Sequence, residues 1–195
     1  MTRAMTGATR KVILFIATSL DGFIARRDGS VDWLFRDGDY GMAEFFRSID
    51  TVLIGRKTHD VMSSFGQTSY RGRKNYVFSR SRPASPAPDV EYTTAAPREL
   101  IETLRLTRGK DIWLVGGSEL IDTFLVEKLV DRITVSVHPV ILGEGIPLFR
   151  GSHEVPLELR GSRSWPSGLA QLDYDVRPAT APTGVRLQKD DASAD

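Results

Sequence analysis

The sequence predicts an α/β fold built on a mixed, mostly parallel β-sheet. Residues 12–17, 51–54 and 112–115 are short apolar runs without alternation, a pattern typical of strands that are covered on both faces in a parallel sheet. The late segments 157–160 and 168–176 have strand character and no helical pattern between them. Because strands joined without a crossover helix pair antiparallel, we expect these two segments to make the sheet mixed.

The remaining elements alternate along the chain. Further strands are expected at 75–78, 90–93 and 132–138. Helical spacing of apolar residues predicts helices near 42–49, 59–62, 97–108 and 118–125. Asp21 and Gly22 predict a turn after the first strand, within an irregular loop. Glycine also punctuates the segment 139–149, which we expect to be a loop.

Length and composition indicate one domain, over residues 10–178. The chain has 195 residues, 41% of them hydrophobic, which is enough for a sizeable core. Its formal charge is +1 with acidic and basic residues interspersed, so it lacks the basic field that nucleic acid or an anionic membrane would attract. We expect residues 1–9 and 179–195 to be disordered tails.

The residue inventory excludes several kinds of site. The chain has no cysteine, which excludes disulfides, thiolate metal sites and a cysteine nucleophile. His59 has no partner pattern, so we expect it to be structural and expect no metal site. His138 is expected to be a buried histidine, with a catalytic role as the alternative. The apolar runs are too short to span a bilayer and no cleavable signal is evident, so a cytoplasmic location is the default.

Two glycines mark the point on which the functional interpretation depends. Gly116 and Gly117 directly follow the run 112–115, and helical spacing begins at Ser118. A strand that ends in glycine and turns into a helix lets backbone N–H groups and the positive end of the helix dipole approach a ligand. This predicts a phosphate site. The alternative is an ordinary strand-to-helix turn in which glycine only serves the geometry.

The same pattern recurs after two other strands. Gly55 follows the run 51–54, and it is followed by Arg56, Lys57 and Thr58. Backbone donors with two cations fit a phosphate group, because charge-assisted hydrogen bonds to phosphate are strong. The alternative is that both cations are solvated surface residues.

A third strand end carries Ser79 and Arg80. If the three strands are neighbours in a parallel sheet, their ends share one edge and could hold one elongated anion, for which a dinucleotide is the natural candidate. The Gly-x-Gly-x-x-Gly fingerprint is absent and no acidic residue is placed to hold a ribose hydroxyl. Arg56 and Arg80 could instead meet a 2′-phosphate, which favours NADP over NAD.

Five motifs begin at Ser19, Gly55, Ser79, Val115 and Pro139, in this order along the chain. Through them the sequence, over about residues 11–176, resembles the dihydrofolate-reductase-like superfamily. Within it the resemblance is to the reductase domain of bacterial riboflavin biosynthesis (RibD C-terminal-like) and its stand-alone relatives. It implies a three-layer α/β/α fold with a mostly parallel sheet of about eight strands. It also implies NADPH bound across the strand ends.

The resemblance assigns cofactor-binding residues to three groups. The pyrophosphate would be held by Gly55, Arg56, Lys57, Thr58, Gly116, Gly117, Ser118, Glu119 and Leu120. Ser79 and Arg80 would hold the ribose phosphate. Ala17, Asp21 and Gly22 would lie on the nicotinamide side. From the residues alone, Asp21 could either lie beside a ligand or simply form the turn.

The substrate side departs from dihydrofolate reductases, which resemble one another in placing a carboxylate on the first helix. No acidic residue falls securely on that position, and Glu44 and Asp39 are the candidates. Glu44 lies two positions after Met42, so it should point away from the apolar stripe of its helix. We therefore expect a substrate other than dihydrofolate.

Two functions follow from these patterns. The first is an NADPH-dependent reductase, similar to 5-amino-6-(5-phosphoribosylamino)uracil reductase, that transfers hydride to a small planar heterocycle of the pyrimidine or pterin type. Asp21, Glu44 or water would supply the proton. The alternative is an NADP-binding protein of the same fold without turnover, acting as a sensor or interaction module. A homodimer is possible, and neither nucleic acid nor membrane is an expected partner.

Overall fold

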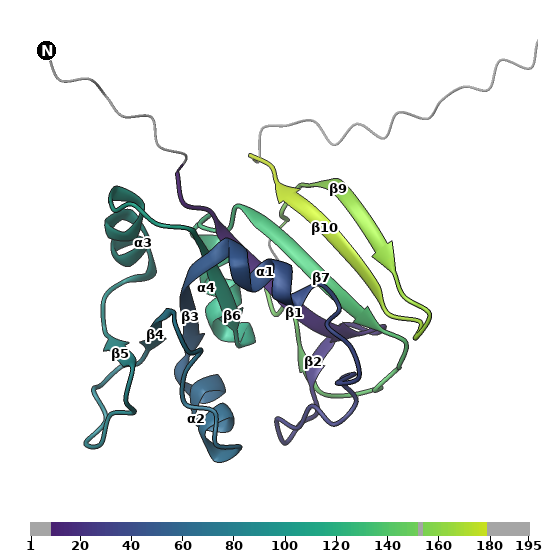
Figure 1. The fold of residues 1–195 in the computed structure, drawn as a ribbon, viewed down its shortest axis with the longest axis horizontal. Coiled ribbons are helices and arrows are strands. Elements are labelled where there is room, and N and C mark those ends of the chain that lie inside the picture. Colours follow the sequence, from purple (N-terminus) through teal and green to yellow (C-terminus); the bar gives the residue numbers. More distant parts are fainter. Residues whose placement is uncertain (1–8, 152–153, 179–195) are drawn as a thin grey trace, which may run out of the picture.

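An eight-stranded sheet forms the centre of the computed structural model, which describes residues 9–151 and 154–178 (Figure 1). The strand order is β5-β4-β3-β6-β1-β7-β10-β9. Six neighbouring strands are parallel: β1 (Val12–Ser19), β3 (Ile49–Gly55), β4 (Lys74–Phe78), β5 (Val90–Thr93), β6 (Asp111–Gly116) and β7 (Arg132–His138). The antiparallel partners are β10 (Ala170–Val176) and β9 (Leu157–Ser164). The mixed, mostly parallel sheet is therefore confirmed.

Helices cover both faces of the sheet and make the fold three-layered. On one face, Val12 and Leu14 of β1 share a core with Ile101 of α3 (Pro97–Leu106) and Phe124 of α4 (Ser118–Val126). On the other face, Ile13 packs in a second core, which is covered by α1 (Met42–Ser48) and α2 (Arg56–Ser64). Because both faces of β1 are buried, its sequence is apolar without alternation.

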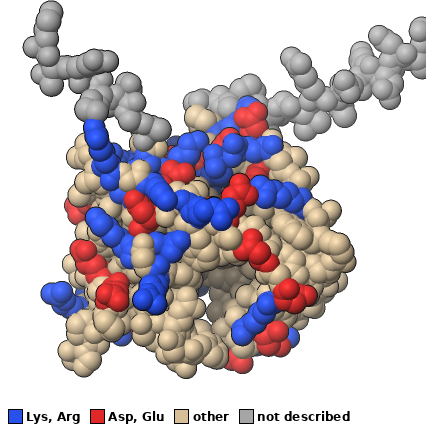
Figure 2. Space-filling view, viewed as in Figure 1, with Lys and Arg blue, Asp and Glu red and all other residues tan. Residues whose placement is uncertain are grey.

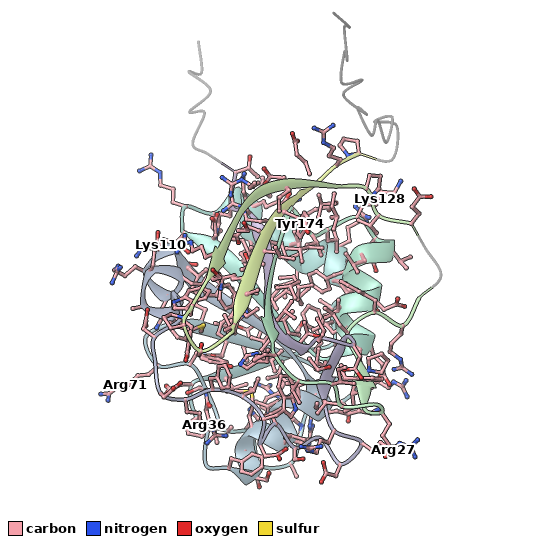
Figure 3. The ribbon with its side chains drawn as sticks, turned by 90° about the vertical axis from the view of Figure 1, so that its right-hand side faces the viewer. Arg27, Arg36, Arg71, Lys110, Lys128 and Tyr174 are labelled. Atoms are coloured by element: carbon pink, nitrogen blue, oxygen red, sulfur yellow. The ribbon has the colours of Figure 1, made fainter. Side chains whose placement is uncertain are left out.

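The structure extends or adds strands where the sequence has no apolar pattern. β9 continues to Ser164, four residues beyond the expected end, because it is an edge strand held by backbone pairing to β10. Figure 3 shows this hairpin facing the viewer, with Tyr174 on β10. A second, two-stranded sheet joins β2 (Phe23–Ala25) to β8 (Ile146–Pro147), where we expected loops. These strands are too short to show a periodicity in the sequence.

The predicted tails lie outside the described residues, except for Thr9. Within the part of the chain that the structure describes, no helix has the length and apolar character needed to cross a membrane. Lys and Arg side chains alternate with Asp and Glu over the face shown in Figure 2, and the lower part of this face is hollowed.

A buried arginine ties together the amino-terminal ends of three strands. Arg10, only 4% exposed, precedes β1. Its guanidinium donates to the Asp50 carboxylate, to Thr51 Oγ1 at 2.6 Å and to the Lys110 carbonyl at 2.7 Å. An added Cβ at Gly109 would lie 2.6 Å from Asp50 Oδ2, so glycine at this position leaves room for the network. Arg10 therefore fixes β1, β3 and β6 against one another at one edge of the sheet.

We predict that Arg10→Ala lowers the free energy of unfolding by about 3 kcal/mol, because removing one member of a buried charge network leaves its partners uncompensated. The matched control is Arg26→Ala, which removes an exposed ion pair with Asp32 and should cost less than about 1 kcal/mol. Urea unfolding of both variants measures the difference. Equal losses would show that the Arg10 network does not stabilise the sheet.

Candidate functional site

Three predicted phosphate-binding segments follow neighbouring strands and reach the same edge of the sheet. β3 lies between β4 and β6, and all three are parallel. In the register, Gly55 is opposite Phe78 and Ile54 is opposite Gly116. Residues 55–58, 79–80 and 116–118 therefore continue from adjacent strand ends. This convergence is the arrangement that one elongated ligand requires.

The two glycine turns approach each other more closely than side chains would allow. A Cβ added to Gly55 would lie 3.2 Å from the Gly116 carbonyl oxygen, and one added to Gly117 would lie 2.9 Å from Thr58 Oγ1. Gly116 also has φ +108°, a conformation that favours glycine. The helices α2 and α4 both begin here, and neither N-terminus is capped by a side chain. Their first N–H groups are thus suited to an anion.

An ion-pair cluster of three residues spans the two helix N-termini. Lys57 Nζ and Arg150 Nη1 each lie 2.9 Å from Glu119 Oε1. The hydrogen bond from Lys57, with a second from Arg150, lowers the pKa of Glu119, which therefore stays ionised. An ionised carboxylate cannot donate to phosphate, so Glu119 is placed to hold two cations near the turns. Arg150 was missed by the sequence analysis because it belongs to no motif.

Ser79, Arg80 and Arg56 lie around the ends of β4 and β5. The Ser79 N–H donates to the Thr93 carbonyl at 3.0 Å, which holds the turn after β4 against β5. Arg80 follows and is exposed. Arg56 donates to Asp60 at 2.8 Å, and its guanidinium lies 5.7 Å from the centre of the Tyr92 ring. Both predicted 2′-phosphate residues are thus at the same edge as the glycine turns.

Asp21 connects two loops above the end of β1. Its carboxylate accepts hydrogen bonds from Ser19 Oγ at 2.6 Å and from the N–H groups of Leu142 at 3.1 Å and Gly143 at 2.7 Å. The Ser19 hydrogen bond is the main reason that the pKa of Asp21 lies below its usual range. Gly22 has φ +85° and completes the turn. This geometry favours a positioning role, because an ionised acceptor is not placed to release a proton.

The two acidic residues near α1 have other contacts. The Glu44 side chain is 67% exposed and lies 3.4 Å from Arg163 Nη1 of β9. It points away from the core, as its position two residues after Met42 predicts. Asp39 Oδ1 accepts the Ala43 N–H at 2.9 Å and so stabilises the start of the helix. Neither carboxylate is buried at the first helix.

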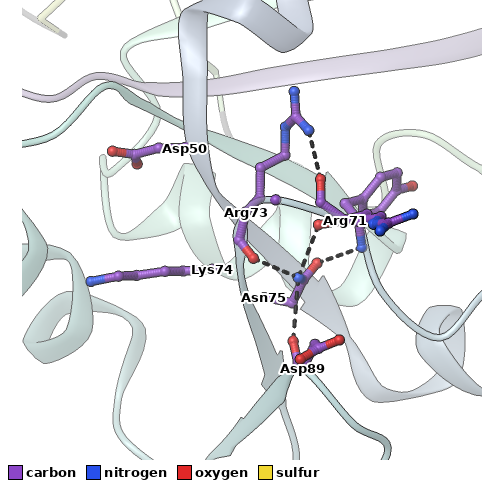
Figure 4. Close-up of a pocket in the computed structure, with 8 residues that line it drawn as sticks. Asp50, Arg71, Arg73, Lys74, Asn75 and Asp89 are labelled. Carbon is purple, nitrogen blue, oxygen red and sulfur yellow. Dashed lines mark hydrogen bonds between the residues drawn. The ribbon is translucent and has the colours of Figure 1, made fainter.

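A hollow of about 460 Å³ lies at the opposite edge of the sheet and is separate from these residues (Figure 4). Asn75 organises it: its amide donates to the Tyr70, Arg73 and Asp89 carbonyls and accepts the Tyr70 N–H at 2.8 Å. Burial raises the pKa of Tyr70 to about 12. These contacts hold the loop before β4 in place, and they explain the hollow without a ligand.

The two histidines among the described residues are both buried. His59 is 2% exposed, and its Nε2 lies 3.0 Å from the Thr68 carbonyl oxygen, which fits the expected structural role. His138 is 4% exposed, as expected for a buried histidine. Among the described residues, no group of three or more His, Asp or Glu side chains could hold a metal ion.

Comparison with known proteins agrees with the fold and the motifs. The model of the family described as "RibD C-terminal domain" matches residues 10–170. YwjB of Bacillus subtilis is 36% identical over 170 residues, which is 85% of this chain and 97% of YwjB. A structure from Shewanella sp. PV-4, named for riboflavin biosynthesis, is 26% identical with a TM-score of 0.77, covering 86% of this chain and 99% of that one.

A more distant structure supports the fold alone. Dihydrofolate reductase from Enterococcus faecalis, complexed with NADP(H), is 13% identical with a TM-score of 0.65, and the match covers 86% of this chain and 97% of that one. The predicted three-layer architecture, the resemblance and the family match therefore agree. The chain belongs to the RibD C-terminal domain family and has a dihydrofolate-reductase-like fold.

Proposed function

We propose that the protein is an NADPH-dependent reductase that transfers a hydride to a small planar heterocycle of the pyrimidine or pterin type. The observation that carries this proposal is the close approach of two glycine turns, Gly55 and Gly117, between uncapped helix N-termini. A side chain at either position would press against the facing turn and move the two helix N-termini apart. The family is reductase-like, and a structural neighbour is complexed with NADP(H).

The residues at this edge fit the cofactor from end to end. The diphosphate would be held by Gly55, Arg56, Lys57, Thr58, Gly116, Gly117, Ser118, Glu119 and Leu120, with Glu119 acting through its two cations. Ser79, Arg80 and Arg56 would hold the 2′-phosphate side. Ala17, Asp21 and Gly22 would lie on the nicotinamide side. NADPH supplies the hydride when bound, and the protein aligns donor with acceptor.

Water fits best among the three proton sources considered for this reaction. Asp21 is an ionised acceptor of three hydrogen bonds. Glu44 is exposed and lies beside Arg163. Neither carboxylate is placed as a buried acid, so solvent reaching the heterocycle is the proposed donor.

We predict that Arg56→Ala and Arg80→Ala each weaken NADPH binding roughly ten- to a hundredfold, because each removes a charge-assisted hydrogen bond to phosphate. NADH, which lacks the 2′-phosphate, should bind Arg80→Ala as it binds the unmodified protein, and Arg56→Ala, whose arginine also faces the diphosphate, should lose less affinity for NADH than for NADPH. Isothermal titration with both nucleotides measures the difference. The control is Arg177→Ala, which removes an exposed arginine paired with Glu158 at the end of β10.

One outcome would contradict the roles of Arg56 and Arg80, and another would contradict nucleotide binding itself. An equal loss for NADPH and NADH would mean that Arg56 and Arg80 do not read the 2′-phosphate. Failure of the unmodified protein to bind either nucleotide would remove the proposed function. NADPH binding without oxidation across a panel of pyrimidines and pterins would instead support the nucleotide-binding role without turnover.

We predict that Asp21→Asn acts through loop position, since the amide places an N–H₂ group where the carboxylate accepts backbone N–H groups. Hydrogen exchange at the Leu142 and Gly143 amides should accelerate, and kcat should fall without loss of an acid-dependent limb in the pH–rate profile. Because the pKa of Asp21 is lowered in the folded protein, its contribution to loop order is present at neutral pH. It should be lost only as pH falls below the usual carboxyl range. Unchanged exchange at both amides would contradict the loop-positioning role.

A further inference from the structure

A histidine at the end of β7 lies under a group of aromatic side chains. We define the aromatic cluster as Trp33, Phe35, Tyr40, His138 and Trp165. The ring centres of Trp33 and Phe35 lie 5.2 and 5.0 Å from that of His138. Phe35 continues to Tyr40 at 6.0 Å, and Tyr40 continues to Trp165 at 5.6 Å. The cluster thus joins the loop before α1 to β7 and to the turn between β9 and β10.

The aromatic cluster begins where the proposed nicotinamide side ends. In the parallel pair of β1 and β7, Ala17 is opposite Ser136 and Ser19 is opposite His138. Residues opposite each other share one face of a sheet, and alternate residues of a strand do too. His138 therefore lies on the same face as Ala17, one row further along. A ring bound against His138 would be close to the point where hydride leaves the cofactor.

The protonation of His138 is set by its surroundings. His138 Nδ1 lies 3.3 Å from the Ser136 carbonyl oxygen, which can only accept, so this nitrogen carries the proton. Burial lowers the pKa of His138, so the ring is neutral near pH 7. Nε2 is then a bare acceptor. No donor among the described residues forms a hydrogen bond with it.

A second polar atom in the cluster also lacks a partner. Trp33 Nε1 is buried and its N–H finds no acceptor among the described residues. Buried polar atoms nearly always have partners, so the Trp33 N–H, on a ring in contact with a histidine whose Nε2 can accept, points to a ligand. Nearby, Gln171 is 3% exposed and donates to Ser136 Oγ at 3.0 Å, so the floor between β7 and β10 is polar. Apolar walls with a few polar groups are typical of small-molecule sites.

We propose that the aromatic cluster recognises the heterocycle, with His138 Nε2 accepting a hydrogen bond from a ring N–H and Trp33 Nε1 donating to a neighbouring oxygen or nitrogen. This inference rests on the proposed reductase function and adds the residues that select the substrate. An N–H beside a carbonyl is the edge of a lactam, as in a pyrimidinone or a pterin. The substrate is therefore an uncharged lactam heterocycle, and His138 and Trp33 determine specificity for it.

A protonated ring fits this site less well than a neutral one. A cationic heterocycle needs a carboxylate, and the two carboxylates in the loop that carries Tyr40 have partners within that loop or in α1. Asp37 accepts the Tyr40 hydroxyl at 2.7 Å, and Asp39 accepts the Ala43 N–H at 2.9 Å. Both line a hollow of about 460 Å³, formed by residues 37–41 and 165–167, which adjoins the cluster at Tyr40 and Trp165.

The test compares two fluorescent probes that differ at one ring nitrogen, pterin and 3-methylpterin. The methyl group removes the N–H that His138 would bind. The unmodified protein should bind pterin roughly ten- to a hundredfold more tightly than 3-methylpterin, since the methylated ring cannot donate to His138 Nε2 and places a methyl group against it. His138→Phe keeps an aromatic ring without the acceptor and should reduce this ratio to about one. His138→Gln offers Oε1 as an acceptor and should restore part of it.

A matched control uses the other described histidine. His59→Gln changes a buried histidine in α2, and it should leave the ratio between the two probes unchanged. Thermal unfolding confirms that each variant is folded before titration. Persistence of the ratio in His138→Phe, or its absence in the unmodified protein, would overturn the inference. Tighter binding of 2,4-diaminopyrimidine at a pH where it is protonated would overturn the preference for a neutral lactam.

A spectroscopic measurement reports directly on the nitrogen. The chain has only three histidines, His59, His138 and His153, so ¹⁵N ring resonances can be assigned with the His138 variants. The Nε2 resonance of His138 should have the shift of an unprotonated nitrogen and move upfield when pterin is added. No movement at saturating pterin would overturn the inference. Titrations with and without NADPH separate this result from the cofactor assignment, because nucleotide binding is measured independently.

Discussion

The closeness of two strand-to-helix turns constrains everything else in the proposed site. Gly55 and Gly117 lie in turns so close that a side chain on Gly117 would overlap Thr58 and one on Gly55 would press on the Gly116 carbonyl. This contact exists because β3 and β6 are hydrogen-bonded neighbours running in the same direction, so that their helices start side by side. Two helix N-termini then contribute positive charge to one small volume. Lys57, Arg150 and Glu119 add a network whose net charge is positive.

The parts of the fold that the sequence predicts are those in which burial leaves a local pattern. The strands β1, β3 and β6 are apolar on both faces, and each appears as an uninterrupted run in the sequence. The three predicted phosphate-binding segments could be placed together because parallel strands that are neighbours end at the same edge. The register of β3 with β4 and β6 shows that these strands are neighbours.

The parts that could not be predicted depend on contacts between distant residues. The sequence identifies Asp21 as a turn residue, yet its carboxylate accepts a hydrogen bond from the Gly143 N–H, 122 positions later in the chain. Arg150 follows an irregular loop and meets Glu119 only because the fold brings them together. The aromatic cluster gathers side chains from three separate segments, and none of them has a spacing that marks it. Local periodicity carries no information about such partners, so only coordinates reveal them.

The position of Arg10 has a consequence for the loops at the proposed site. Its network fastens the sheet at the edge opposite the proposed site, where Asp50 and Lys110 begin their strands. The network that stabilises the sheet and the proposed site thus lie at opposite ends of the same strands. Because Arg10 bonds no described residue of the loops at the proposed site, we expect changes in those loops to leave its network intact.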